Sequence, residues 1–516
     1  MKKISFFGLV LSFMAMAIFI VSCSQPLYPD GSTYRPGGGN TGGRDIPGWD
    51  TDGSSPCGRM TVAEQLQWLR TNPRAAAGTV WYVWAWMTPH ETIHLRQDIH
   101  GVGGLGTAIT VNLRTYRGYP GPDNRRRLLL DSSDSGPMTM LSVLDGNTLI
   151  LENIILQGRD NNGASLVVVS AGTLKKGNDS EIRGHDGILE SAAVSANAGA
   201  TFTMSGNARI TNSNTGVFVS GAYFHMNEEA RITANNLGVA VRQNGNFIMS
   251  TDASIYGNNT GVHASDSGRV YMNDDANIRN NAERGAVISF DSVLIMLDYA
   301  EIRHNYCTGV SLSSGGQLFM YDYAAIHNNI STSAGGVWVE GYSHIHMYGN
   351  ASIHSNFSYV TTGTDPGSIR SGGVTLSALG LVNYNSLRMH GNARIWGNST
   401  NSTTAGGGVT FLGGNARLYI SGGTIYGTLQ EPSTSEPDYY NKSDGTSFHA
   451  VRNANNTNNL RIAVYLPYNS RPTPVIGRPG TLSFTVVNLS LPHGNGANNN
   501  TIRVWDNGTN DNSSDW

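Results

Sequence analysis

Hydrophobic residues recur in one phrase with near-constant spacing from about Phe202 to Asn398. Each copy holds a methionine, an alanine four residues later and an isoleucine two residues after that. The copies begin at Met204, Met226, Met249, Met272, Met296, Met320, Met347 and Met389, with intervals of 22, 23, 23, 24, 24, 27 and 42 residues. A period in this range indicates a solenoid, whose units bury apolar surface by stacking on one another.

The alternation inside each copy predicts short strands. An apolar residue stands two positions before each methionine, as in Phe202 and Phe224, and this period of two is typical of a strand with one buried face. Ala-x-Ile continues the alternation on a second strand, and a third follows a glycine, as in Gly336-Val337-Trp338-Val339. Three parallel strands per coil of about 22–24 residues, spaced roughly 4.8 Å from coil to coil, therefore predict an all-β parallel β-helix.

Asparagine recurs three residues after the isoleucine, at Asn235, Asn258, Asn281, Asn305, Asn329, Asn356 and Asn398. We expect this column to hydrogen-bond from coil to coil inside a turn, where backbone groups would otherwise be buried without partners. The pattern resembles the right-handed parallel β-helix superfamily that includes pectate lyases, where such ladders occur. It also resembles the repeats of bacterial β-helical adhesins and autotransporter passengers. These resemblances imply the fold and leave the activity open.

The chain outside the repeats divides by composition. Residues 58–140 are expected to form an N-terminal cap helix and the first strands, because Thr61 and Glu64 make a capping box before an apolar helix face. Residues 141–428 hold the parallel β-helix repeats. Residues 429–516 are read as irregular terminal rungs and a C-terminal cap, and a separate small β domain after about residue 428 is the alternative.

The N-terminus has the pattern of an export signal. Lys2 and Lys3 precede an apolar run from Phe6 to Val21, which is short for a membrane-spanning helix. A small residue before Cys23 resembles the lipobox of bacterial lipoproteins, which implies a signal peptide over 1–22 and lipid attachment at Cys23. An ordinary secretory signal with a chance cysteine is the alternative. Residues 23–57, rich in Gly, Pro and Ser, then form a flexible tether. This predicts a lipid-anchored protein of the cell envelope, at the outer rather than the inner membrane.

Charge and cysteine content limit the kinds of partner and of covalent cross-link that we expect. The net charge of −3 becomes −5 once Lys2 and Lys3 are removed, so a concentrated basic surface for nucleic acid is not expected. Cys57 and Cys307 are too few for a disulfide framework. We expect a monomer whose membrane contact runs through the lipid on Cys23.

Acidic residues recur in the turn between methionine and alanine. The candidate acidic ridge consists of Glu228, Asp252, Asp274, Asp275, Asp298 and Asp322. Stacked carboxylates can hold Ca²⁺, and paired carboxylates can serve glycoside hydrolysis. The alternative is structural, because Asp and Asn favour turns for backbone reasons. The ridge lacks the motifs of polygalacturonases and a basic residue placed to act as a lyase base, so we name no catalytic residue.

Outward residues just before the methionines form a second column. Its apolar part, the candidate binding stripe, consists of Ile248, Tyr271, Ile295 and Phe319. Exposed apolar patches often mark binding sites. The structural alternative is β-propensity together with cover of the stripe by a loop or the tether. His327 and His354 occupy equivalent positions on successive coils, but no third residue completes a metal site.

Together these patterns favour a non-enzymatic, adhesin-like protein that binds a glycan or a host or matrix protein without an organic cofactor. A polysaccharide lyase or glycoside hydrolase that uses the acidic ridge is the alternative. A structural spacer of the envelope is the third possibility.

Overall fold

The computed structural model describes the following residues: 43–45, 60–71, 80–85, 91–99, 108–115, 125–133, 136–187, 191–359, 371–377, 384–400, 407–412, 416–420, 423–425 and 464–465. All of them belong to one compact unit that begins at Gly43. The predicted signal peptide, Cys23 and most of the predicted tether lie outside these ranges. No helix in the described ranges is long and apolar enough to span a membrane.

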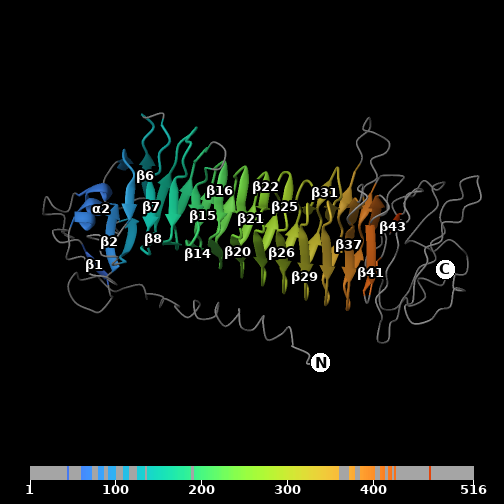
Figure 1. Ribbon diagram of the computed structural model, residues 1–516. Coiled ribbons are helices and arrows are strands. Elements are labelled where there is room, and N and C mark those ends of the chain that lie inside the picture. The colour runs from blue at the N-terminus through green and yellow to red at the C-terminus, as the bar shows by residue number, and fades with distance from the viewer. Residues whose placement is uncertain are drawn as a thin grey trace, which may run out of the picture. The chain divides into compact units, whose positions relative to one another are not determined.

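The fold is an all-β, right-handed parallel β-helix, as the repeat predicts, and the described ranges contain one short helix (Figure 1). Within the described ranges three long sheets, here called A, B and C, contain 14, 13 and 13 strands, and neighbouring strands in each sheet are parallel. From β2 onward successive strands along the chain belong to different sheets, so each coil contributes one strand to each of the three long sheets.

The strands of sheet A are β1 (Gly43–Asp45), β2 (Val80–Ala85), β5 (Thr110–Thr115), β8 (Thr148–Glu152), β11 (Thr173–Lys176), β14 (Thr201–Met204), β17 (Tyr223–Met226), β20 (Asn246–Met249), β23 (Arg269–Met272), β26 (Val293–Met296), β29 (Gln317–Met320), β33 (His344–Met347), β37 (Asn385–Met389) and β41 (Ala416–Ile420). The strands of sheet B are β3 (Glu91–Ile93), β6 (Arg126–Leu130), β9 (Ile154–Gln157), β12 (Glu181–Arg183), β15 (Arg209–Thr211), β18 (Arg231–Thr233), β21 (Ser254–Tyr256), β24 (Asn277–Arg279), β27 (Glu301–Arg303), β30 (Ala325–His327), β34 (Ser352–His354), β38 (Arg394–Trp396) and β42 (Thr424–Ile425). The strands of sheet C are β4 (Gln97–Ile99), β7 (Leu141–Leu144), β10 (Val167–Ser170), β13 (Val194–Ala196), β16 (Thr215–Ser220), β19 (Leu237–Arg242), β22 (Thr260–Ala264), β25 (Arg284–Ser289), β28 (Val310–Ser313), β32 (Val337–Glu340), β36 (Val374–Ser377), β40 (Val409–Leu412) and β43 (Val464–Tyr465).

The core is built from in-register columns of identical side chains. Methionine pairs with methionine along sheet A, and isoleucine pairs with isoleucine along sheet B. The methionines, alanines and isoleucines of the repeat are fully buried. Phe202, Phe224 and Phe247 stack inside the coils, with ring centroids 4.5 and 4.8 Å apart. Like residues stack because each coil adds one strand at the same register to the sheet before it.

The asparagine column forms the predicted ladder. The backbone N–H and the Nδ2 of Asn281 both donate to Oδ1 of Asn305, at 3.0 and 2.9 Å. Asn305 makes the same pair of bonds to Asn329, and the pattern continues to Asn398. Each amide therefore satisfies two buried donors of the preceding coil.

The N-terminal end is covered by the predicted helix, α2 (Val62–Thr71). Thr61 Oγ1 accepts from the N–H of Glu64 at 3.1 Å, and Glu64 Oε2 accepts from the N–H of Thr61 at 2.8 Å. Val62, Leu66 and Leu69 are buried in the core. The strands that precede residue 141 already belong to sheets A, B and C, so the predicted boundary at 141 does not coincide with a change of sheet. Strand β1 pairs with β2, so a strand interrupts the predicted flexible tether at residues 43–45.

Towards the C-terminus a short fourth sheet appears, formed by β31 (Ile330–Ser331), β35 (Phe357–Ser358) and β39 (Ser399–Thr400). It lies at the corner that follows sheet B, in the coils where the repeat interval lengthens. Strand β43 pairs with β40, which extends sheet C into the segment predicted to hold irregular terminal rungs. The rest of residues 429–516 lies outside the described ranges.

Candidate functional site

The acidic ridge occupies the corner between sheets A and B and separates into two columns. Glu228, Asp274, Asp298 and Asp322 stand two residues after the methionine, with φ between 54° and 55°. Asp252 and Asp275 stand one residue later, in the neighbouring column. All six side chains are exposed. Glycine takes the first column's left-handed position in other coils, as at Gly206 and Gly349.

The first column has a structural task. Asp274 Oδ2 accepts from the N–H of Thr251 at 3.0 Å, and Asp298 Oδ2 accepts from the N–H of Asp274 at 3.4 Å. Glu228 Oε2 likewise accepts from the N–H of Gly206 at 2.6 Å. Each of these three acids thereby caps the turn of the preceding coil, which offsets the cost of a left-handed backbone for a residue with a side chain. One oxygen of these carboxylates is engaged and the other faces solvent.

The ridge does not assemble a metal centre. In the described part of the chain no group of three or more His, Cys, Asp or Glu side chains is arranged to hold a metal ion. Ca²⁺ prefers six to eight oxygen ligands, whereas successive carboxylates here lie in a line along a convex corner.

The candidate stripe lies on the outer face of sheet A as predicted. Strand register places Ile248, Tyr271, Ile295 and Phe319 side by side in consecutive strands. All four side chains are half-buried. The column continues beyond Phe319, first to His346, whose ring stacks on Phe319 with centroids 4.6 Å apart.

Two further aromatic columns lie on the side of this stripe that faces the acidic corner, and the sequence interpretation missed them. Tyr321, Tyr348 and His390 follow the methionines directly and stack at 4.9 and 4.7 Å. Tyr299 and Tyr323, three residues after their methionines, stack at 5.1 Å and are 57% and 54% exposed. Their fixed offsets from methionine were visible in the sequence. We call the following residues the aromatic face: Ile295, Leu297, Tyr299, Phe319, Tyr321, Tyr323, His346 and Tyr348.

The rings of the aromatic face stack on one another along the coils, with interplanar angles between 7° and 19°. Ring faces inside a column therefore cover each other. The columns present ring edges, Tyr hydroxyls and imidazole nitrogens to solvent. Such a surface combines apolar contact with hydrogen bonding, the combination that makes tyrosine common in binding sites.

A second ladder runs along the outer face of sheet B. Arg279 lies over the Tyr256 ring at 4.5 Å, and His354 stacks on both His327 and Trp396, at 4.8 and 4.4 Å. His327 Nε2 lies 3.5 Å from Glu301 Oε1, and this hydrogen bond is the main cause that lowers the pKa of Glu301. Burial lowers the pKa of His354 to about 4. The two histidines predicted to be equivalent are thus stacked neighbours.

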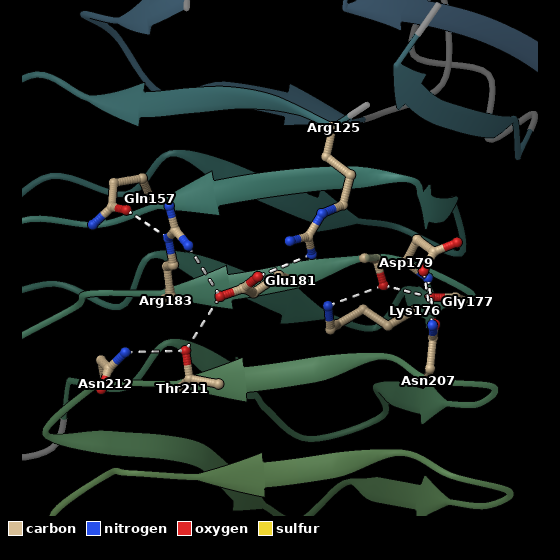
Figure 2. Close-up of polar contacts among 11 residues, drawn as sticks. Arg125, Gln157, Lys176, Gly177, Asp179, Glu181, Arg183, Asn207, Thr211 and Asn212 are labelled. Atoms are coloured by element: carbon tan, nitrogen blue, oxygen red, sulfur yellow. Dashed lines mark hydrogen bonds and ion pairs between the residues drawn. The ribbon is translucent and has the colours of Figure 1, made fainter. Parts of the chain in front are cut away.

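One buried amine lies in line with the methionine column, on the coil before Met204 (Figure 2). Lys176 pairs in register with Met204, is 1% exposed, and donates from Nζ to Ser180 Oγ at 3.1 Å. Burial lowers its pKa to about 7. Outside the coil, Glu181 pairs with Arg125 at 2.9 Å and with Arg183 at 3.4 Å. Because Lys176 and Ser180 are closed to solvent, this amine and hydroxyl do not form an accessible reactive pair.

No protein-family model, no curated protein and no solved structure matches this chain. The architecture places it in the class of parallel β-solenoids. The resemblance to the pectate-lyase-like superfamily therefore rests on that architecture alone, and function has to be argued from the surface.

Proposed function

We propose that this protein is a non-enzymatic, adhesin-like binding protein of the bacterial cell envelope. It presents the aromatic face of sheet A to a glycan or protein ligand and is held at the outer membrane by a lipid on Cys23. The observation that carries the proposal is the aromatic face itself. Half-buried and exposed rings from three coils form one patch that spans the edge of sheet A and the adjoining corner, and such patches mark interaction surfaces.

The acidic corner supports binding over catalysis. Its first column is engaged in capping turns, and its carboxylates are exposed on a convex edge. Catalysis by a pair of carboxyl groups calls for a shielded site that separates their pKa values. A polysaccharide lyase or hydrolase remains testable on the same residues. Depolymerisation of an acidic glycan by the wild type, abolished in Asp274→Asn plus Asp298→Asn, would contradict the non-enzymatic proposal.

The binding proposal is tested with the purified chain on arrays of immobilised glycans and matrix proteins. Tyr299→Ser plus Tyr323→Ser is expected to lower binding to the captured ligand at least tenfold. Tyr223→Ser is the matched control, because Tyr223 is 60% exposed on the same sheet but lies outside the aromatic face. Equal binding by the double variant and the control would refute the assignment of the surface.

The envelope location is tested separately. Cys23→Ser is expected to abolish both acyl labelling and membrane association, and retention of both would refute the lipid anchor. Protease treatment of intact cells then distinguishes surface exposure, which an adhesin requires, from a periplasmic orientation.

A further inference from the structure

Four basic or titratable side chains gather at the C-terminal border of the aromatic face. His344 and His346 come from β33, Arg388 comes from β37, and His390 directly follows β37. Strand register puts His346 beside Arg388. Tyr348 lies among them, with its hydroxyl 3.5 Å from His346 Nδ1. All four side chains are half-buried on the outer face of sheet A. We call them the basic cluster.

Arg388 is the permanently charged member of the basic cluster. Arg388 lies over the Tyr419 ring at 4.7 Å, and its Nε is buried without a hydrogen-bond partner. Among the described residues no carboxylate forms an ion pair with Arg388. The pKa of His346 is lowered to about 4, first by burial and then by Arg388 and the other two histidines. Burial and Arg388 also lower the pKa values of His344 and His390.

The charge of the corner changes at the same place along the solenoid. The acidic ridge ends at Asp322. In the next two coils its two columns contain Gly349 with Asn350 and Gly391 with Asn392. In these two columns the coils that contain the basic cluster thus lack the carboxylates found on the five coils before them. A guanidinium that is bordered by aromatic rings and has no carboxylate partner among the described residues is complementary to an anionic ligand.

We propose that the basic cluster binds sulfate groups of a sulfated polysaccharide, while Phe319, Tyr348 and Tyr419 contact its sugar rings. This inference rests on the proposed function and names the ligand class of that surface. A guanidinium accepts an oxyanion through parallel N–H bonds, and each imidazole adds a donor when protonated. Sulfate esters stay ionised at the acidic pH where these buried histidines gain protons. Carboxylates lose their charge in that range.

The probes are dextran sulfate, carboxymethyl dextran and unmodified dextran, measured by biolayer interferometry on the full-length protein. We expect dextran sulfate to bind at least tenfold more tightly than either other polymer at pH 7. We also expect its affinity to rise as the pH falls to 4.5, because binding is then coupled to protonation of the histidines. Equal binding of dextran and dextran sulfate, or of the carboxymethyl polymer and the sulfate, would overturn the proposal.

Arg388→Gln and His346→Gln are each expected to weaken dextran sulfate binding at least fivefold, and Arg388→Lys to restore part of the loss. Arg269→Gln is the matched control, because it removes one exposed positive charge from the same sheet outside the basic cluster. An equal loss in Arg269→Gln would show general charge attraction and overturn the site. If dextran sulfate fails while array ligands still bind through Tyr299 and Tyr323, this inference fails and the proposed function stands.

Discussion

Asn305→Ala tests the physical basis of the asparagine ladder. Asn305 is 1% exposed and accepts two bonds at Oδ1, from the backbone and the side chain of Asn281. Its own Nδ2 donates to Asn329. Truncation removes the acceptor, so the N–H and the Nδ2 of Asn281 are both left buried without their partner. The backbone N–H of Asn305 keeps its bond to Asn329.

The magnitude follows from the two orphaned donors. A buried polar group left unsatisfied costs about 1–3 kcal/mol, so the pair costs about 2–6 kcal/mol of unfolding free energy. Asn259→Ala is the control. Asn259 is exposed, and its Nδ2 donates to Oδ1 of Asn236 at 2.7 Å. When the Asn259 side chain is truncated, water can replace it as the hydrogen-bond partner of Asn236. We expect that control to lose no more than about 0.5 kcal/mol.

The assay is guanidinium unfolding at 25 °C followed by far-UV circular dichroism. Amide hydrogen exchange in the coils around Asn281 and Asn305 locates the damage. In a solenoid the loss should appear first in the affected coil and its neighbours, because each unit contacts only adjacent units. If Asn305→Ala loses no more stability than Asn259→Ala, or if exchange rises equally in distant coils, the ladder does not act as argued here.

Three further predictions concern a buried lysine, a glycine at a close backbone approach and an acid at a left-handed turn position. Lys176→Met should stabilise the fold at pH 7. In the wild type, the unfolding free energy should rise with pH between about 7 and 10.5 by up to about 1.4 kcal/mol per pH unit, because Lys176 binds its proton more tightly in the unfolded chain. Thermal melts across that pH range would measure this rise, and the profile of the variant should be flat. Gly285→Ala should cost about 1–3 kcal/mol in chemical unfolding, because its Cβ would lie 2.5 Å from the Gly309 carbonyl oxygen. Both Asp298→Ala and Asp298→Gly remove the hydrogen bond from the N–H of Asp274, but only glycine adopts the left-handed backbone at this position without strain. Asp298→Ala should therefore lose about 1–2 kcal/mol of unfolding free energy, while Asp298→Gly stays near wild type. Equal losses in these two variants, again by chemical unfolding, would count against that explanation.

The fold could be predicted from the sequence because the residues at its core positions are repeated. Met272 sits on Met249 and Ile278 on Ile255, so the intervals predicted the register directly. The asparagine ladder was predictable for the same reason. Strand β1 was not, because three residues of a Gly-rich segment form a strand only by pairing with β2. Sequence periodicity contains no signal for such an edge addition.

The candidate site was only partly predictable, because outward positions vary from coil to coil. The sequence placed Tyr271 and Phe319 in one column, but the neighbouring tyrosine columns became evident only when all three offsets were seen on one surface. The acids of the ridge were ambiguous for a physical reason. A side chain at a left-handed turn position can cap the preceding coil and face solvent at once, and Asp298 does both.

The same in-register stacking that forms the core also organises the surface. A parallel coil repeats every outward position at the spacing of its strands, so like side chains meet whether or not they bind anything. Ring stacking alone is therefore weak evidence for a site, and so is a row of acids. The break in the pattern is more informative. In the two coils after Asp322 both columns of the ridge lack carboxylates, and among the described residues no carboxylate forms an ion pair with Arg388. The Tyr419 ring gives Arg388 a cation–π contact but leaves its buried Nε without a hydrogen-bond partner, which an anionic ligand can satisfy.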